Sequence, residues 1–165
     1  MTAPRGIYWD TNVVVALMEQ SGIVHDLLWA ILEVIEKKPV YVSTSALTFA
    51  ELKVKPLQQQ NFELLRTYEE WSSSRSWLDI WSITPPILDG AALLRATRGG
   101  LKLPDAIHLA TALHSRCTHF LTADKGIGDI TDLVHPFSGP LDITPLTILR
   151  PDEPTLTSLL KSMAE

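Results

Sequence analysis

Short apolar runs alternate with longer amphipathic stretches along this chain of 165 residues. Such alternation is typical of β-α units, in which helices connect the strands of a parallel sheet. Strands are predicted at residues 7–9, 40–42, 81–84, 120–123 and 146–149. The pattern therefore predicts an α/β fold with a central, mostly parallel sheet of about four to five strands.

Helices are predicted where apolar residues recur at a spacing of three and four. The clearest one covers residues 23–36 and ends in the Lys-Lys-Pro sequence at 37–39, which is typical of a helix C-terminus. Other helices are predicted at residues 13–18, around Glu51 as far as Pro56, at 87–97, from Asp105 onward and at 153–163. A helical hairpin is predicted over residues 57–77, with a break at the serines 72–74. We expect one domain over residues 1–150, followed by a C-terminal helical extension over residues 151–165 that packs on it or flanks it.

The net charge is -5, which argues against the extended basic surface that gives repressors and histones their affinity for nucleic acid. An enzyme that holds a phosphodiester through a bound cation is compatible with this charge. The one cysteine, Cys117, fits a reducing compartment, and packing is favoured for it over a nucleophilic role. No N-terminal signal segment or long apolar span is recognisable, so we expect a cytoplasmic protein without membrane association.

Four acidic residues occupy comparable places in the predicted β-α pattern. Asp10 follows the first strand, Glu51 lies in the helix after the second, Asp105 begins a helix, and Asp124 ends the fourth strand. Because an open parallel sheet binds its ligands at the carboxyl ends of the strands, these acids are expected to converge. Converging carboxylates raise one another's pKa unless a cation lies between them. The set therefore predicts a site for Mg²⁺ or Mn²⁺, which prefer oxygen ligands.

Each acid also has a purely structural explanation. Asp10 and Asp105 could cap helix N-termini, where a carboxylate accepts hydrogen bonds from free N–H groups. Glu51 follows Thr48 at the spacing of a capping box, and Asp124 could open a turn. The ordered set of four, rather than any single member, favours a metal site.

The segments that carry these acids are YWDTN at residues 8–12, the stretch at 45–52, PDAIHLATAL at 104–113 and LTADKG at 121–126. In this order they resemble the PIN-domain ribonucleases, and among them the toxins of toxin-antitoxin pairs of the VapC type. The resemblance extends over residues 7–126. It implies a PIN-like α/β/α sandwich and a Mg²⁺- or Mn²⁺-dependent endoribonuclease that hydrolyses RNA phosphodiester bonds. It also implies an antitoxin protein as partner and a homodimer.

The resemblance assigns the same four acids to the metal and to catalysis. The positions that match the family's acidic quartet are Asp10, Glu51, Asp105 and Asp124. By this similarity Asp10 and Asp105 are the most direct metal ligands. Glu51 or Asp124 would then position or deprotonate the attacking water, while the cation lowers the pKa of water and neutralises charge on the phosphoryl group.

Other residues near the acids are assigned supporting roles. Asn12 and Thr122 match polar residues of the family that help to arrange the first and last acids. Arg98, Lys102 and Lys125 could contact the phosphate backbone of RNA, although cationic residues are also common at helix ends for electrostatic reasons.

His108 and a group of tryptophans are expected to take no direct part in catalysis. His108 stands three residues after Asp105, and packing or a hydrogen bond to a ligand side chain is favoured for it over acid catalysis. Trp71, Trp77 and Trp81 lie in a region where the family resemblance places dimer and antitoxin contacts. A protein interface is therefore favoured for them over base stacking.

Two other functions fit parts of the pattern. The same fold could serve as a catalytically silent module that binds RNA or protein, although such a module has no need to retain all four acids. A phosphotransfer domain also gathers aspartates at strand ends, but Asp10 lacks the second aspartate two residues later that the haloacid dehalogenase pattern contains. A metal-dependent endoribonuclease is therefore the predicted function.

Overall fold

The computed structural model of the protein describes residues 4–73 and 77–164. Its central sheet contains β1 (Gly6–Trp9), β2 (Tyr41–Ser45), β3 (Leu78–Trp81), β4 (His119–Leu121) and β7 (Thr147–Leu149). The strand order is β3-β2-β1-β4-β7, and every neighbouring pair is parallel. The predicted α/β fold with a mostly parallel central sheet is thereby confirmed.

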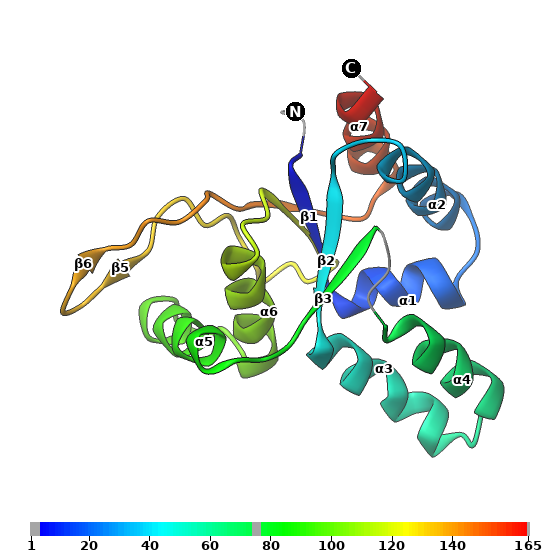
Figure 1. Cartoon of the computed structure of the whole chain (residues 1–165), viewed down its shortest axis with the longest axis horizontal. Coiled ribbons are helices and arrows are strands. Elements are labelled where there is room, and N and C mark those ends of the chain that lie inside the picture. The colour runs from blue at the N-terminus through cyan, green and yellow to red at the C-terminus, as the bar shows by residue number, and fades with distance from the viewer. Residues whose placement is uncertain (1–3, 74–76, 165) are drawn as a thin grey trace.

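Helices cover both faces of this sheet, as Figure 1 shows. One face carries α1 (Thr11–Glu19), α2 (Ile23–Ile35), α3 (Ala46–Gln58), α4 (Phe62–Trp71) and α7 (Glu153–Ala164), and the other carries α5 (Pro85–Thr97) and α6 (Leu103–His114). A two-stranded hairpin of β5 (Val134–His135) and β6 (Gly139–Pro140) extends beyond α5. The layers are those of an α/β/α sandwich.

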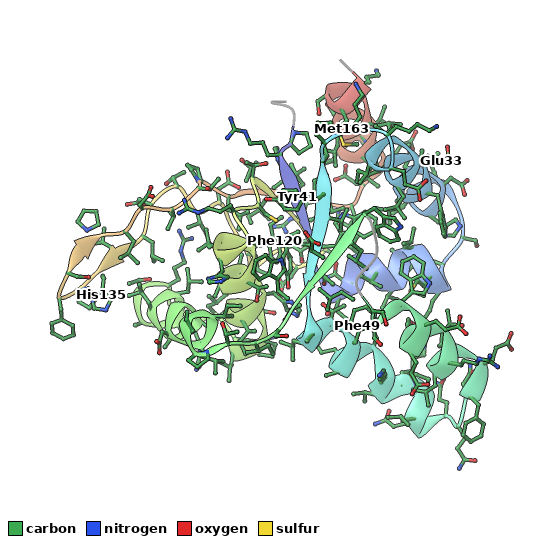
Figure 2. All side chains as sticks on the ribbon, in the orientation of Figure 1. Glu33, Tyr41, Phe49, Phe120, His135 and Met163 are labelled. Atoms are coloured by element: carbon green, nitrogen blue, oxygen red, sulfur yellow. The ribbon has the colours of Figure 1, made fainter. Side chains whose placement is uncertain are left out.

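The central strands divide their side chains between two cores. Ile7 and Trp9 of β1 enter the first core, which lies against α1, α2, α3, α4 and α7, whereas Tyr8 enters the second core against α5 and α6. Phe49 and Phe120, labelled in Figure 2, lie in the first and second core respectively. The strand β1 is covered on both faces and has no polar position, which is why it could be recognised from its sequence.

Several element boundaries differ from the prediction, two of them near the first core. The third strand covers Leu78–Trp81 rather than residues 81–84, because Leu78 is the buried apolar position that packs in the first core. The helix after β2 was predicted to end near Pro56 but continues to Gln58. The ring of Pro56 is buried in the last turn, where its missing N–H removes a single helical hydrogen bond.

The segment between Asp124 and Leu146, where the sequence predicts neither helix nor strand, contains the β5–β6 hairpin. Gly139 has φ of 83°, which a glycine adopts without strain, and it pairs with His135 across the turn. A hairpin of two-residue strands has too little alternation to be recognised in a sequence. The predicted break at the serines 72–74 falls partly on Ser74, which lies outside the described residues.

Within the described ranges, no single helix is long and apolar enough to cross a membrane. The helices α1 and α2 satisfy the length and composition test only as a pair, and they are bent by 103° relative to each other.

The C-terminal helix α7 completes the first core. Leu156 and Leu159 are fully buried, and they belong to the same apolar cluster as Leu28 and Ile31 of α2. The described part of the C-terminal segment therefore shares a core with the sheet. Its separation from a domain at residues 1–150 stays a prediction.

Replacing Leu159 with alanine should lower the free energy of unfolding by about 2–5 kcal/mol, because it leaves a cavity between α7 and α2. Urea denaturation measures this loss. Ser158→Ala, an exposed change on the same helix, should alter the free energy by less than about 0.5 kcal/mol. Similar values for both variants would show that α7 does not stabilise the core.

Candidate active site

Asp10 lies at the carboxyl end of β1, where it also caps α1. Its Oδ1 accepts a hydrogen bond from the Thr11 N–H at 2.7 Å. Its Oδ2 accepts from Asn12 Nδ2 and from Thr122 Oγ1, each at 2.6 Å. The residue is only 8% exposed. The capping role considered for Asp10 is therefore present, and a second set of bonds holds the same carboxylate in one orientation.

Asn12 and Thr122 connect the ends of β1 and β4. The Asn12 Oδ1 accepts from the Ala123 N–H at 2.8 Å, while its Nδ2 lies 3.2 Å from Thr122 Oγ1. The Thr122 hydroxyl also accepts from the Asp124 N–H at 3.0 Å. A threonine hydroxyl has one donor and two acceptor positions, and all three are used here. The two residues contact the acids that they were predicted to arrange.

Asp105 approaches the same region from α6. This helix begins at Leu103 with Lys102 as N-cap, so the prediction that Asp105 opens the helix is wrong by two residues. Pro104 is tolerated inside the first turn because the N–H it lacks has no helical partner there. Burial, followed by the charges of Asp124 and Asp10, raises the pKa of Asp105. Three carboxylates therefore repel one another across this edge of the sheet.

Glu51 reaches the site from α3, whose N-cap is Ser45. The capping box with Thr48 is absent, since Thr48 lies inside the helix and its hydroxyl is 2.8 Å from that of Thr44. The Oε2 of Glu51 instead accepts from the Thr11 hydroxyl and from His108 Nε2. Burial raises the pKa of Glu51, but these hydrogen bonds outweigh it and the net pKa is lowered. The carboxylate is therefore held ionised.

His108 joins Glu51 to the second core. Its ring is buried, with Nδ1 at 2.8 Å from the Tyr8 hydroxyl and Nε2 at 3.1 Å from Glu51 Oε2. Burial, followed by the charge of Asp10, raises the pKa of Tyr8, so its hydroxyl stays protonated and donates to Nδ1. This leaves the Nε2–H to donate to Glu51. His108 thus makes the hydrogen bond to a proposed ligand side chain that was expected of it.

The donor set suits a hard divalent cation. As they stand, no three carboxylate, imidazole or thiol groups of residues 4–73 and 77–164 are placed to hold one metal ion together. Mg²⁺ needs fewer, because it keeps several waters and is commonly held by one or two carboxylates. Asp10 and Asp105 supply oxygens, and the repulsion of Asp105 by Asp124 and Asp10 is only partly offset by Lys102 and His108. A cation between them would remove that repulsion, so these residues fit Mg²⁺ or Mn²⁺.

The basic residues predicted near the acids are arranged differently from one another. Arg98 is half-buried and donates from Nη1 to the Asp129 carbonyl at 3.1 Å. Lys102 is exposed and precedes Asp105 by three residues. Lys125 is exposed and directly follows Asp124. Their proposed contact with RNA stays a prediction.

Sequence reasoning missed Arg150. This residue donates to the Thr122 carbonyl at 3.1 Å and to the Ile127 carbonyl at 2.5 Å, and so fixes the turn that carries Asp124. Its position directly after the last strand was the only available signal. Cys117, by contrast, is buried, and burial raises the pKa of its thiol to about 11, which agrees with a packing role.

Residues 7–133 match the model of a family described as the PIN domain. No curated protein matches the chain significantly. The fold is shared with a chain of the VapBC2 structure from Rickettsia felis bound to a promoter DNA fragment, at a TM-score of 0.57 and 17% identity over 72% of this chain and 88% of that one. A toxin-antitoxin complex from Klebsiella pneumoniae gives a TM-score of 0.57 and 22% identity over 89% and 98%. The structure of FitAcB from Neisseria gonorrhoeae gives a TM-score of 0.50 and 25% identity, and the match covers 73% of this chain and 88% of that one.

Replacing Asp105 with asparagine should raise the melting temperature of the metal-free protein at neutral pH. Because the pKa of Asp105 is raised above the ordinary value of 3.8, its ionised form destabilises the folded state at any pH above that range. The advantage of the variant should shrink as the pH falls toward about 4. Adding Mg²⁺ should stabilise the wild type more than the variant. A lower melting temperature for the variant in a chelator would contradict the repulsion.

Replacing His108 with leucine should destabilise the protein by about 1–3 kcal/mol, because it leaves the buried Tyr8 hydroxyl and Glu51 without their partner. Tyr8→Phe removes the same contact from the other side. The two changes combined should therefore cost less than their sum, with a coupling of about 0.5–3 kcal/mol in urea denaturation. Strictly additive losses would show that the two side chains act independently.

Proposed function

The chain belongs to the PIN domain family, and we propose on this basis that it is a Mg²⁺- or Mn²⁺-dependent endoribonuclease that acts as the toxin of a toxin-antitoxin pair. The observation that carries the proposal is the meeting of Asp10, Asp105 and Asp124 at one edge of the sheet. A buried or half-buried group of carboxylates destabilises a fold unless a cation balances it. Such a cation is also what an acidic protein needs to hold a phosphodiester.

When bound, the cation acidifies water at the site and offsets the negative charge of the phosphoryl oxygens. Asp10 and Asp105 would hold it most directly, and Asp124 would complete the oxygen set or act through water. Thr11, Asn12 and Thr122 already fix the orientation of the Asp10 carboxylate. The turn that carries Asp124 is fixed in the same way by Arg150.

Glu51 is suited to orient the attacking water. Its lowered pKa keeps the carboxylate ionised at neutral pH, so it can accept a hydrogen bond from water. Both of its hydrogen bonds to Thr11 and His108 fall on Oε2, which leaves Oε1 to make that contact. The Tyr8–His108 pair thus acts as a positioning device for Glu51 rather than as an acid or base.

The proposed partners are an antitoxin protein and a second copy of the chain. The similar structure from Klebsiella pneumoniae is described as a toxin-antitoxin complex, which supports the first of these. Val54, Leu57 and Phe62 on the α3–α4 hairpin are 51%, 60% and 76% exposed, and clustered exposed apolar side chains are typical of protein interfaces. Trp71 and Trp77 pack against the first core instead. A cytoplasmic location belongs to the same proposal.

Asp10→Asn should reduce Mg²⁺-dependent cleavage of RNA by at least about 100-fold, since even residues that only orient metal ligands are worth 10- to 100-fold. Asp89→Asn, which changes an exposed acid on α5, is the matched control and should cleave like the wild type. A chelator should abolish cleavage, and Mn²⁺ should restore it. Equal cleavage by Asp10→Asn and the wild type, at equal purity, would refute the assignment.

A further inference from the structure

A small cavity lies beside α6, near the segments that carry Asp105 and Asp124. Its volume is about 330 Å³, at the lower end of the range for ligand pockets, about 300–1,000 Å³. It is enclosed by the loop between α5 and α6 and by the turn after β4. Its lining residues are Arg98, Gly99, Gly100, Leu101, Leu109, Gly126, Ile127 and Gly128.

The cavity touches the elements that hold two of the acids. Leu109 follows Asp105 by four residues on α6, so both side chains lie on one face of that helix. Gly126 follows Asp124 by two residues and donates its N–H to the Asp124 Oδ1 at 2.8 Å. A phosphodiester held at Asp105 and Asp124 would therefore place a neighbouring nucleotide against this cavity.

Glycines form half of the lining, and at three of them the position of a Cβ atom is open. A Cβ atom added at Gly99, Gly100 or Gly128 would meet no atom within 4 Å. Gly100 has φ of 82°, so the turn itself requires a glycine there, but no such requirement applies to Gly99 or Gly128. The backbone conformation at Gly99 and Gly128 would accept a larger residue, so the open space there is not a by-product of the turn. A flat group can lie directly against such a backbone.

The remaining lining residues give the cavity an apolar floor and a cationic rim. Leu109 and Ile127 are buried and supply the floor. Arg98 is held at the rim by its bond to the Asp129 carbonyl, and a guanidinium has further donors and a flat face for stacking. The exposed Lys102 and Lys125 adjoin the lining in sequence. An apolar floor with a stacking cation is how unpaired bases are bound in RNA recognition.

We propose that this cavity binds one unpaired nucleoside of the RNA substrate, next to the phosphodiester that is cut. The base packs on Leu109 and Ile127, and Arg98 stacks on it or contacts its phosphate. The cavity therefore contributes to the choice of cleavage site. This inference rests on the proposed endoribonuclease function. The larger groove of about 660 Å³ between α5 and the β5–β6 hairpin contains no lysine or arginine in its lining, so it lacks a group for phosphate.

Filling the cavity tests this inference without touching the acids. Gly128→Leu and Gly99→Leu place a side chain into open space, whereas Ala92→Leu adds similar bulk to the larger groove as a control. With single-stranded RNA and Mg²⁺, both glycine variants should raise KM at least 10-fold and change the nucleotide preference beside the cut. Melting temperature and Mn²⁺ affinity should stay at wild-type values for all three. A glycine variant that keeps the wild-type KM and cleavage pattern would overturn the proposal.

A binding measurement separates this inference from the proposed function. The four nucleoside monophosphates, which contain no internucleotide bond to cut, are titrated into the metal-free protein and followed by the amide NMR signals of Gly99, Gly126 and Gly128. We expect millimolar binding that shifts these signals in the wild type and in Ala92→Leu but not in Gly128→Leu. Shifts without any RNA cleavage would refute the nuclease and keep the nucleoside site. Cleavage by the wild type without shifts at these glycines would refute the nucleoside site alone.

Discussion

The site depends on the hydrogen bonds that the carboxylate of Asp10 accepts. It accepts hydrogen bonds from the first turn of α1, from Asn12 and from Thr122, and so joins the ends of β1 and β4. The Asp10 N–H also donates to the Leu121 carbonyl, which continues the pairing of these strands beyond the sheet. A parallel sheet delivers several strand ends to one edge, but it does not orient the groups there. At this edge the orientation comes from side chains that bond to one another.

The same polar network explains why the fold tolerates acids close to its core. Thr122 uses its donor for Asp10 and both acceptor positions for Asn12 and the Asp124 backbone, so no buried hydroxyl group is left unpaired there. Tyr8 and His108 do the same for Glu51 from the second core. Asp10 and Glu51 are thus held by hydrogen bonds from polar residues at the strand ends and on the flanking helices. The repulsion that persists falls on Asp105.

The sequence was sufficient to predict the layers and the approach of the acids to one edge of the sheet, because both follow from periodic patterns and strand ends. The buried strand β1 is apolar throughout, and Asp10 follows it directly. The β5–β6 hairpin could not be predicted, since strands of two residues show no periodicity. Arg150 was missed for a different reason. It donates hydrogen bonds to the backbone carbonyls of Thr122 and Ile127. Every residue type has such a carbonyl, so the sequence gives no sign of which residues Arg150 contacts.

The pKa values of Glu51 and Asp105 are shifted in opposite directions, and this difference suits them to different roles. Hydrogen bonds from His108 and Thr11 lower the pKa of Glu51, so it is ionised without help from a cation. Burial and two neighbouring carboxylates raise the pKa of Asp105, so a cation nearby would stabilise its ionised form. Environments that push two carboxyl groups apart in pKa commonly mark different tasks in one site. Asp105 is therefore the better candidate for direct contact with a cation, and Glu51 for contact with water.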